Sequence, residues 1–330
     1  MLAEHANRLR HRAGSAGGHY ESYFVRANHP TRRLAFWVRH TIFSPRGRPQ
    51  DALGELWAIV FDGERGRHVA VKQEWPLALC RFDDQTLRIT LPGAALDAHA
   101  AQGHCASGSH RIDWDLRYAG AAPALLLLPP SLYDGSFPKA KSLVSQPSVH
   151  FSGHLRIDGE ALEVERWPGS QNHNWGRQHT DRYAWGQVAG FDGHEDSFLE
   201  AASAKLRVGP WWTPWITPLV LRHRGREHRL NALWRSLRAR ASLQGFEWRF
   251  DSADDVLRVQ GQVSARAADF VGLRYANPPG GIKHCLNSKI AHCELQLDYA
   301  DGGARETLVS DRCAFEILTD PSDHGVVLAC

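Results

Sequence analysis

Short segments in which polar and apolar residues alternate recur along almost the whole chain, and they constrain its fold more than any other feature. Alternation with period two places every second side chain on one face, as in a half-buried β-strand. Four Asp-Gly pairs, which accept the positive backbone angles of tight hairpins, separate such segments. These pairs are Asp62-Gly63, Asp158-Gly159, Asp192-Gly193 and Asp301-Gly302. The pattern predicts an all-β chain built from antiparallel strands.

The expected strands form two groups of similar style, which favours two β domains over one. In the first half they are 34–43, 54–62, 68–75, 86–91, 111–118 and 150–157. In the second half they are 182–191, 198–208, 219–223, 246–251, 256–265, 290–299 and 313–318. Antiparallel domains of this length close most readily as barrels or sandwiches, which hold small ligands at a mouth or a seam.

One segment has the period of a helix instead. Apolar residues at Leu230, Leu233, Trp234, Leu237 and Ala241 keep a spacing of three and four residues. This spacing places them on one stripe of a helix. We therefore expect a short amphipathic helix in the second half of the chain.

Composition excludes several classes of partner and cofactor. Lys plus Arg exceed Asp plus Glu by only three in 330 residues, which disfavours nucleic acid as a main partner. No Gly-rich phosphate loop follows a strand and opens a helix, so nucleotide cofactors are not expected. The longest apolar run, 124–128, is too short to cross a bilayer, and the N-terminus lacks the apolar stretch of a secretory signal. We expect a cytoplasmic protein without a cofactor.

Cysteine and histidine spacing argues against a metal centre. The six cysteines show no paired CxxC spacing and are typical of reduced thiols. A dense group at His99, His104, Cys105 and His110 lacks helical or zinc-knuckle spacing. We therefore expect no metal site.

The segment 170–176, Ser-Gln-Asn-His-Asn-Trp-Gly, concentrates an imidazole, amides and an indole in a stretch that we predict as β. Its Trp-Gly pair recurs at residues 185–186. On a strand, His173 and Trp175 share one face, and Asn172 and Asn174 share the other. Asparagine is unfavourable in strands, so a buried hydrogen-bond network or a ligand compensates it. Two interpretations stay open, a satisfied core pair and a functional site.

Three segments together resemble the tandem-lipocalin superfamily of carotenoid 1,2-hydratases, tocopherol cyclases, AttH-like proteins and lipocalin-type Diels-Alderases. They are residues 20–24, 35–43 and the Asn-His-Asn-Trp-Gly motif at 172–176. The resemblance implies two lipocalin-like β-barrels in tandem, which we expect at 19–167 and 168–330. The N-terminal segment, with its arginines, glycines and alanines, predicts a flexible tail at 1–18. The resemblance also implies an apolar pocket in or between the barrels, and chemistry on isoprenoid or polyketide-like molecules without a redox cofactor.

The hydratase branch of this superfamily implies functional roles for His173 and Trp175. A Tyr and an Asp on a following strand of that branch would correspond here to Phe198 and Glu200. This chain departs from the pattern, because Phe198 lacks the hydroxyl and Glu200 is one methylene longer than aspartate. The resemblance therefore implies the architecture more directly than the reaction.

Hydration or cyclisation of an alkene needs a proton donor, a cavity that excludes water, and aromatic faces that stabilise a cation. Burial favours the neutral form of a carboxyl group, so Glu200 or Asp181 could remain protonated near neutral pH. His173 could relay the proton or activate a water molecule. Asp181 has a second interpretation, as the cap of a turn. Glu200 is either solvated at a barrel mouth or functional.

The expected substrate-binding residues share an aromatic or amide side chain near these acids. They are Asn172, Asn174, Trp175, Tyr183, Trp185, Phe198, Trp211, Trp212 and Trp215. The three tryptophans at 211–215 have an alternative role, as a rigid plug in the core or between the barrels.

These features favour a cofactor-independent lyase or cyclase that acts on a hydrophobic isoprenoid, terpenoid or polyketide-like small molecule by acid catalysis. Two alternatives stay open. One is a carrier protein that binds an apolar ligand without turnover, and the other is a pericyclic enzyme that relies on shape and a hydrogen bond to a carbonyl. Peripheral membrane contact for substrate pickup also stays open.

Overall fold

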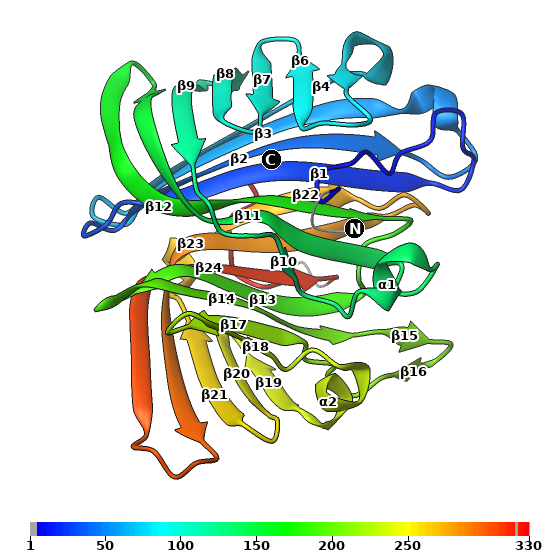
Figure 1. Ribbon diagram of the computed structural model, residues 1–330. Coiled ribbons are helices and arrows are strands. Elements are labelled where there is room, and N and C mark those ends of the chain that lie inside the picture. The colour runs from blue at the N-terminus through cyan, green and yellow to red at the C-terminus, as the bar shows by residue number, and fades with distance from the viewer. Residues whose placement is uncertain (1–4, 321–322, 330) are drawn as a thin grey trace.

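Two large antiparallel sheets make up the computed structural model, which describes residues 5–320 and 323–329 (Figure 1). The fold is nearly all β, as the alternating pattern predicts. The first sheet occupies the upper half of Figure 1 and the second sheet the lower half. Among the described residues, the α-helices α1 (Ser131–Asp134) and α2 (Leu233–Arg238) are short, and no helix is long and apolar enough to cross a membrane.

The first sheet contains twelve strands of the described chain, in the order β4-β3-β2-β1-β12-β11-β9-β8-β7-β6-β5, with β10 paired to β11. Their bounds are β1 His19–Asn28, β2 Leu34–Ser44, β3 Leu53–Asp62, β4 Arg67–Pro76, β5 Arg81–Phe82, β6 Arg88–Leu91, β7 Ala94–Asp97, β8 Ala100–Ser107, β9 His110–Ala119, β10 Leu125–Leu126, β11 Ala140–Ile157 and β12 Glu160–Gly176. The sheet curls until β8 reaches β4, where the backbone N–H of Ala106 donates to Gln73 Oε1 at 3.1 Å.

The second sheet contains ten strands of the described chain, in the order β18-β17-β14-β13-β24-β23-β21-β20-β19, with β22 paired to β23. Their bounds are β13 Arg182–Phe191, β14 His194–Lys205, β17 Leu219–His223, β18 Arg226–Arg229, β19 Arg240–Gln244, β20 Glu247–Ala253, β21 Leu257–Ser264, β22 Val271–Ala276, β23 Ile282–Tyr299 and β24 Glu306–Thr319. Strands β15 (Arg207–Val208) and β16 (Trp211–Trp212) form a separate hairpin, and short 3-10 turns lie at Pro49–Asp51, Leu77–Leu79 and Ala267–Asp269.

Turn chemistry and strand length explain where these elements begin and end. The Asp158-Gly159 pair joins β11 to β12 with φ angles of +51° and +92°, as the sequence predicts for a tight hairpin. The expected helix at 230–241 is shorter than predicted, because Arg240 and Ala241 pair with β20 in the second sheet. Tertiary pairing here overrides the local helical period.

The division between the two sheets falls between Gly176 and Arg182, later than the boundary at 167/168 that we expected. Pro168 and Gly169 do not interrupt β12, since they lie in register with His150 and Val149 of β11. The asparagine-rich motif is therefore the end of the last strand of the first sheet along the chain, and not the start of the second sheet. Its strand pairs with β1 on one side and β11 on the other.

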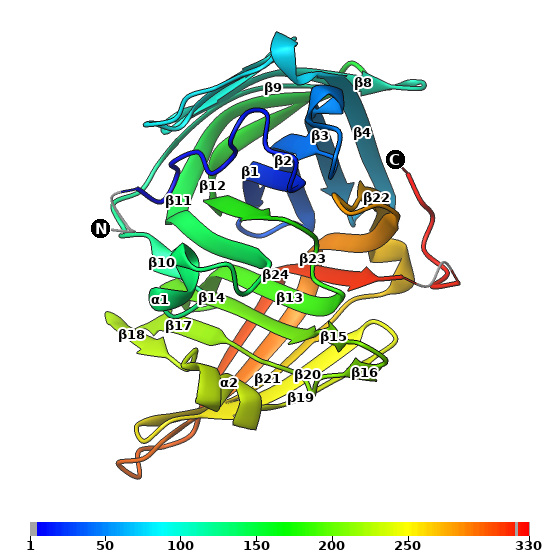
Figure 2. The ribbon, with the colours of Figure 1, turned by 90° about the vertical axis from the view of Figure 1, so that its right-hand side faces the viewer.

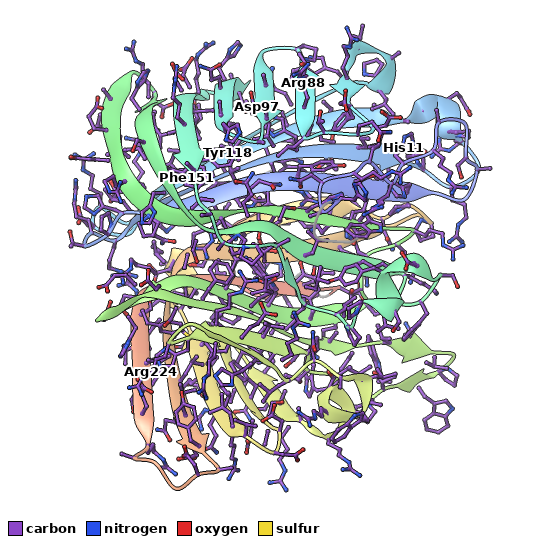
Figure 3. All side chains as sticks on the ribbon, viewed as in Figure 1. His11, Arg88, Asp97, Tyr118, Phe151 and Arg224 are labelled. Atoms are coloured by element: carbon purple, nitrogen blue, oxygen red, sulfur yellow. The ribbon has the colours of Figure 1, made fainter. Side chains whose placement is uncertain are left out.

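Apolar side chains fill three regions, one inside each curl and one between the sheets (Figure 3). In the layer between the sheets, Phe24 of β1 meets Trp185 of β13 edge-on, with ring centroids 6.4 Å apart. Trp57 of β3 meets Tyr275 of β22 in the same way at 5.7 Å. Each curl thus has its own core, as in a lipocalin-like barrel, and a third apolar layer joins the two barrels.

Candidate active site

A cavity of about 200 Å³ lies between the two sheets, beside the third apolar layer. Strands of both sheets supply its walls, and α1, α2 and the hairpin β15–β16 lie on the side of the molecule shown in Figure 2. The lining residues on which the site depends are Tyr20, Phe24, Trp37, Arg39, Asn172, Asn174, Tyr183, Trp185, Glu200, Tyr275 and Glu316. The cavity is therefore aromatic, with a few polar groups placed among the rings.

Glu200 of β14 is an acidic residue that lines this cavity. It accepts hydrogen bonds from Trp185 Nε1 and Gln187 Nε2, each at 2.8 Å. Burial raises the pKa of Glu200 to about 7, although the two hydrogen bonds lower it in part. Both partners are N–H donors, so neither accepts the carboxyl proton. The protonated group is left to donate toward the cavity.

Gln187 of β13 connects this acid to the first sheet. Its Nε2 also donates to Asn172 Oδ1 at 2.7 Å, and its Oε1 accepts from Arg26 Nε and from Ser170 Oγ, each at 2.7 Å. Arg26 is fully buried, and burial lowers its pKa to about 10, so the guanidinium stays charged. Asn172 thus belongs to a buried network around Glu200, as its place in a strand predicts.

A second carboxyl group, Glu316 of β24, lines the same cavity with a cation beside it. Lys289 Nζ lies 2.8 Å from Glu316 Oε1, and Asn287 Nδ2 donates to the same oxygen at 3.0 Å. Tyr183 donates its hydroxyl to Glu316 Oε2 at 3.3 Å. The charge of Glu316 is thus compensated, whereas no cation forms an ion pair with Glu200 among the described residues.

His173 is among the residues that line the cavity, but strand alternation places its side chain on the opposite face of β12 from the two asparagines of the motif. Its register partner is Tyr23 of β1, and both rings stack inside the first curl at a centroid distance of 4.2 Å. Nδ1 lies 2.7 Å from the carbonyl oxygen of Ala6, and Nε2 lies 2.9 Å from Glu21 Oε1. Both oxygens are acceptors, so each ring nitrogen already lies within hydrogen-bond distance of an oxygen. The side chain therefore has no free nitrogen for a proton relay to Glu200.

Glu21 of β1 is the centre of this second cluster. Burial alone would raise its pKa, but the hydrogen bonds from His173 and His19 outweigh burial and hold the pKa well below the ordinary range. Further donors to its oxygens are the hydroxyl of Tyr23 at 2.8 Å and the backbone N–H groups of Arg10 and His11 at 2.8 and 2.6 Å. Residues 5–18, which we expected to form a flexible tail, are anchored here. His11 lies over the strands of the first sheet in Figure 3.

Other predicted site residues divide between the cavity and places outside it. Tyr183, Trp185, Asn172 and Asn174 line the cavity. Trp175 shares the face of His173, 4.7 Å from its ring, and Arg10 lies over the indole at 5.1 Å. Phe198 precedes Glu200 on the same face of β14, but it packs into a small apolar cluster with Leu125, Val144, Ala189 and Val220.

Asp181 and the tryptophans at 211–215 do not contribute to the cavity wall. Asp181 Oδ2 accepts from the backbone N–H of Arg207 at 2.9 Å, so this carboxylate contacts the start of β15 and not the backbone of its own turn. Trp211 and Trp212 lie on β16, with 77% and 44% of their surface exposed. Trp215 is half-buried beside Lys205, whose Nζ lies 5.0 Å from its ring. These tryptophans form neither a core plug nor an aromatic wall of the cavity.

The sequence analysis did not identify three candidate functional residues. Arg39 and Glu316 line the cavity, and Gln187 donates a hydrogen bond to Glu200. Arg39 carries the clearest signal in the sequence. It follows Trp37 and Val38 in an apolar strand, where an inward-facing arginine is unusual. The roles of Gln187 and Glu316 depend on pairing between distant strands, which alternation does not specify.

The fold and this cavity define a class, that of tandem lipocalin-like proteins with a buried site between two curled sheets. Within that class the chain belongs to the tocopherol cyclase-like family, whose model matches residues 144–317. A comparison with curated proteins finds no match.

Solved structures share the whole architecture at low sequence identity. A Nitrosomonas europaea protein assigned as AttH is 12% identical, with a TM-score of 0.56, and the match covers 94% of this chain and 97% of that one. Kievitone hydratase from Nectria haematococca is 10% identical, with a TM-score of 0.53 and coverages of 97% and 92%. CghA is 11% identical, with a TM-score of 0.53 and coverages of 93% and 89%. These likenesses show the fold.

Proposed function

We propose that this protein is a cofactor-independent lyase or cyclase that protonates an alkene of a hydrophobic isoprenoid, terpenoid or polyketide-like substrate. The observation that carries the proposal is Glu200, a buried carboxyl group with a pKa raised to about 7 in an aromatic cavity. Such a group supplies the general acid that alkene hydration or cyclisation needs. The family match and the names of two structural neighbours, a hydratase and a member of this fold solved as CghA, support this assignment.

In this mechanism Glu200 transfers its proton to one alkene carbon, and the cation forms on the other. Trp37 and Trp185 line the cavity, and the π-electrons of such aromatic side chains stabilise a cation. Water or an internal hydroxyl then attacks, and Glu200 as a carboxylate accepts the released proton. Gln187 and Trp185 hold the carboxyl group in place throughout. His173 positions the N-terminal residues and does not take part in proton transfer.

The decisive experiment replaces one atom of the acid. Glu200→Gln keeps the shape and the acceptor oxygen but removes the proton donor. We expect turnover of prenylated phenols or polyenes to fall by about 10²-fold or more. In D₂O, the wild type places one solvent deuterium on carbon in the product, as mass spectrometry would show. The control is Glu227→Gln, which changes a surface ion pair of β18 with Arg222.

The same experiment separates the alternatives. Unchanged turnover in Glu200→Gln without deuterium on carbon would replace acid catalysis by a pericyclic reaction. Binding of an apolar ligand without any product, in the wild type as in the variant, would leave a carrier protein. Each result contradicts the proposal above.

We also propose that the substrate enters from an anionic membrane surface. Leu233 of α2 and Phe137 line the cavity and are themselves exposed, so they mark its mouth. Strand β16, whose Trp211 and Trp212 are exposed, lies on the same side of the molecule as α2 (Figure 2). Arg207 lies over the ring of Trp212, and Arg235 and Arg238 lie over Trp234, an exposed tryptophan next to Leu233 in α2. Exposed aromatic side chains flanked by cations are suited to the interface of an anionic bilayer.

A further inference from the structure

Arg39 is a buried cation that faces the cavity from the middle of β2. Only 4% of its surface is exposed, and its register partners are Phe24 of β1 and Trp57 of β3. Strand alternation places it on the same face as Trp37, toward the second sheet. The guanidinium group therefore lies in the aromatic wall of the cavity, not at the protein surface.

The polar contacts of Arg39 leave part of its guanidinium group without an acceptor. Nη2 donates to Ser22 Oγ at 2.6 Å, and the guanidinium carbon lies 4.5 Å from the ring centroid of Tyr275. Its buried Nε has no hydrogen-bond partner, and no ion pair with a carboxylate of the described residues forms within 4 Å. Burial lowers the pKa of Arg39, but the tyrosine and the more distant charges of Glu55 and Glu316 outweigh burial and raise it, so the group is a cation. A buried donor without an acceptor is unfavourable, so the site favours a ligand oxygen, and an anionic one most.

Arg26 is a second buried arginine between the sheets, and in contrast to Arg39 each of its nitrogens donates to an oxygen of the protein. Its Nε and Nη2 donate to the side chain and backbone oxygens of Gln187, at 2.7 and 3.3 Å. Its Nη1 donates to Asn28 Oδ1 at 2.9 Å. All three nitrogens of Arg26 thus have protein acceptors, whereas Arg39 keeps donors for a ligand.

The other charges of the cavity agree with an anionic ligand. Lys289 compensates Glu316 by an ion pair at 2.8 Å. Glu200 is neutral below a pKa of about 7 and does not repel an anion there. The wall around Arg39 therefore carries a net positive charge in an otherwise aromatic cavity. A planar guanidinium binds two oxygens, or one charged oxygen, by parallel N–H donors.

We propose that Arg39 forms an oxyanion subsite, and that the ligand is an apolar molecule with one acidic oxygen group such as a carboxylate, phenolate or enolate. The inference rests on the proposed function insofar as both use the same cavity. Binding of the acidic group at Arg39 fixes which part of the apolar body reaches Glu200. Arg39 is a specificity-determining residue in this arrangement.

A matched pair of ligands tests this subsite without knowledge of the natural substrate. Decanoate and decanamide have the same chain length but differ in charge, and titration calorimetry at pH 6.5 measures both. We expect the wild type to bind decanoate at least about ten-fold more tightly than decanamide, since hydrogen bonds to charged groups are the stronger ones. Arg39→Met should lose that preference and keep its affinity for decanamide, with circular dichroism confirming the fold. Arg88→Met in β6 is the matched exposed control, because Arg88 does not line the cavity.

The outcomes distinguish this subsite from the acid mechanism. Equal affinities of the wild type for the two ligands, or a preference that survives in Arg39→Met, would overturn the inference. Loss of turnover in Glu200→Gln would still support the proposed function in that case. Conversely, a preference that depends on Arg39, together with full turnover in Glu200→Gln, would leave the subsite standing and overturn the acid mechanism. If Arg39→Met fails to fold, Arg39→Lys keeps a charge and should retain a weaker preference for decanoate.

Discussion

Two buried glutamates, Glu21 and Glu200, lie in the two sheets of this molecule and have opposite acid strengths. Glu21 has two imidazole partners at 2.9 and 3.0 Å, a tyrosine hydroxyl and two backbone N–H donors. Glu200 has one indole and one amide donor and no ion-pair partner among the described residues. Burial favours protonation of both groups, yet only Glu200 keeps a raised pKa.

The comparison shows that burial alone does not make a catalytic acid. Cations and many donors convert a buried carboxyl group into a structural anion, as at Glu21. Neutral donors in small number hold the group in place and leave its proton available, as at Glu200. The glutamate without a cation is also the one that lines the cavity.

The largest expected effect is on the pH profile of turnover. Glu200 acts as an acid while it is protonated, so kcat should decline as the pH rises through about 7. The expected loss is about 10²-fold or more between pH 6 and pH 9, since a general acid contributes that much. Steady-state rates across this range would measure it. A rate that is constant from pH 6 to 9 would contradict the role of Glu200.

The next effect is on stability and concerns Glu21. Glu21→Gln replaces one carboxylate oxygen by an N–H₂ donor and leaves buried donors around it without an acceptor, so we expect the free energy of unfolding to fall by about 3 kcal/mol. Urea denaturation measures the change. Glu64→Gln, in an exposed pair with Arg32, is the matched control and should cost less than about 1 kcal/mol. A loss at Glu21 as small as at Glu64 would contradict its structural role.

The two glutamates should also give opposite slopes of stability with pH. The lowered pKa of Glu21 gives a contribution that is present above the ordinary value of 4.5 and is lost as the pH falls through the folded-state pKa. The raised pKa of Glu200 gives a contribution that is present below 4.5 and is lost as the pH rises through about 7. Glu200→Gln should therefore remove the decline between pH 4.5 and 7, which unfolding curves at several pH values would show. An unchanged decline would contradict the raised pKa.

A smaller effect tests the connection through Gln187. Gln187→Leu removes a donor that lowers the pKa of Glu200, so the alkaline decline of kcat should move to higher pH. The lost hydrogen bonds should also reduce stability by about 1–3 kcal/mol. The pH profile of the variant, compared with that of the wild type, measures the shift. A shift to lower pH would show that Gln187 does not stabilise the carboxylate.

The smallest effect concerns the mouth of the cavity. Replacement of Trp211 and Trp212 by Ala should weaken flotation with anionic phosphatidylglycerol vesicles by about ten-fold, from the loss of buried apolar area. The wild type and each variant should bind neutral phosphatidylcholine vesicles less than they bind the anionic vesicles. Leu79→Ala, at an exposed apolar residue in the 3-10 turn between β4 and β5, is the control. Equal binding of the wild type and the tryptophan variant would remove the proposed membrane route.

Local patterns predicted an all-β chain with two groups of strands, and the family resemblance implied lipocalin-like barrels, which the fold confirms. The catalytic role of Glu200 stays a prediction, although the structure places this residue in the cavity. Strand alternation also predicted that His173 and Trp175 share one face of a strand, which the register with β1 confirms. It did not show which face turns toward the second sheet, because that depends on how the two sheets pack. Arg39 meets Tyr275 across more than two hundred residues of sequence, and no period encodes such a contact.

Gln187 belongs to the second sheet but holds Arg26 of the first sheet and Glu200 through the two ends of one amide. Gln187 and Glu200 are register partners on neighbouring strands of the second sheet, so the bond between them moves with that sheet. Displacement of the first sheet would instead stretch the bonds of the same amide to Arg26, Ser170 and Asn172. The donor that orients the acid is thus anchored within one sheet and would stay with the acid if the two sheets shifted.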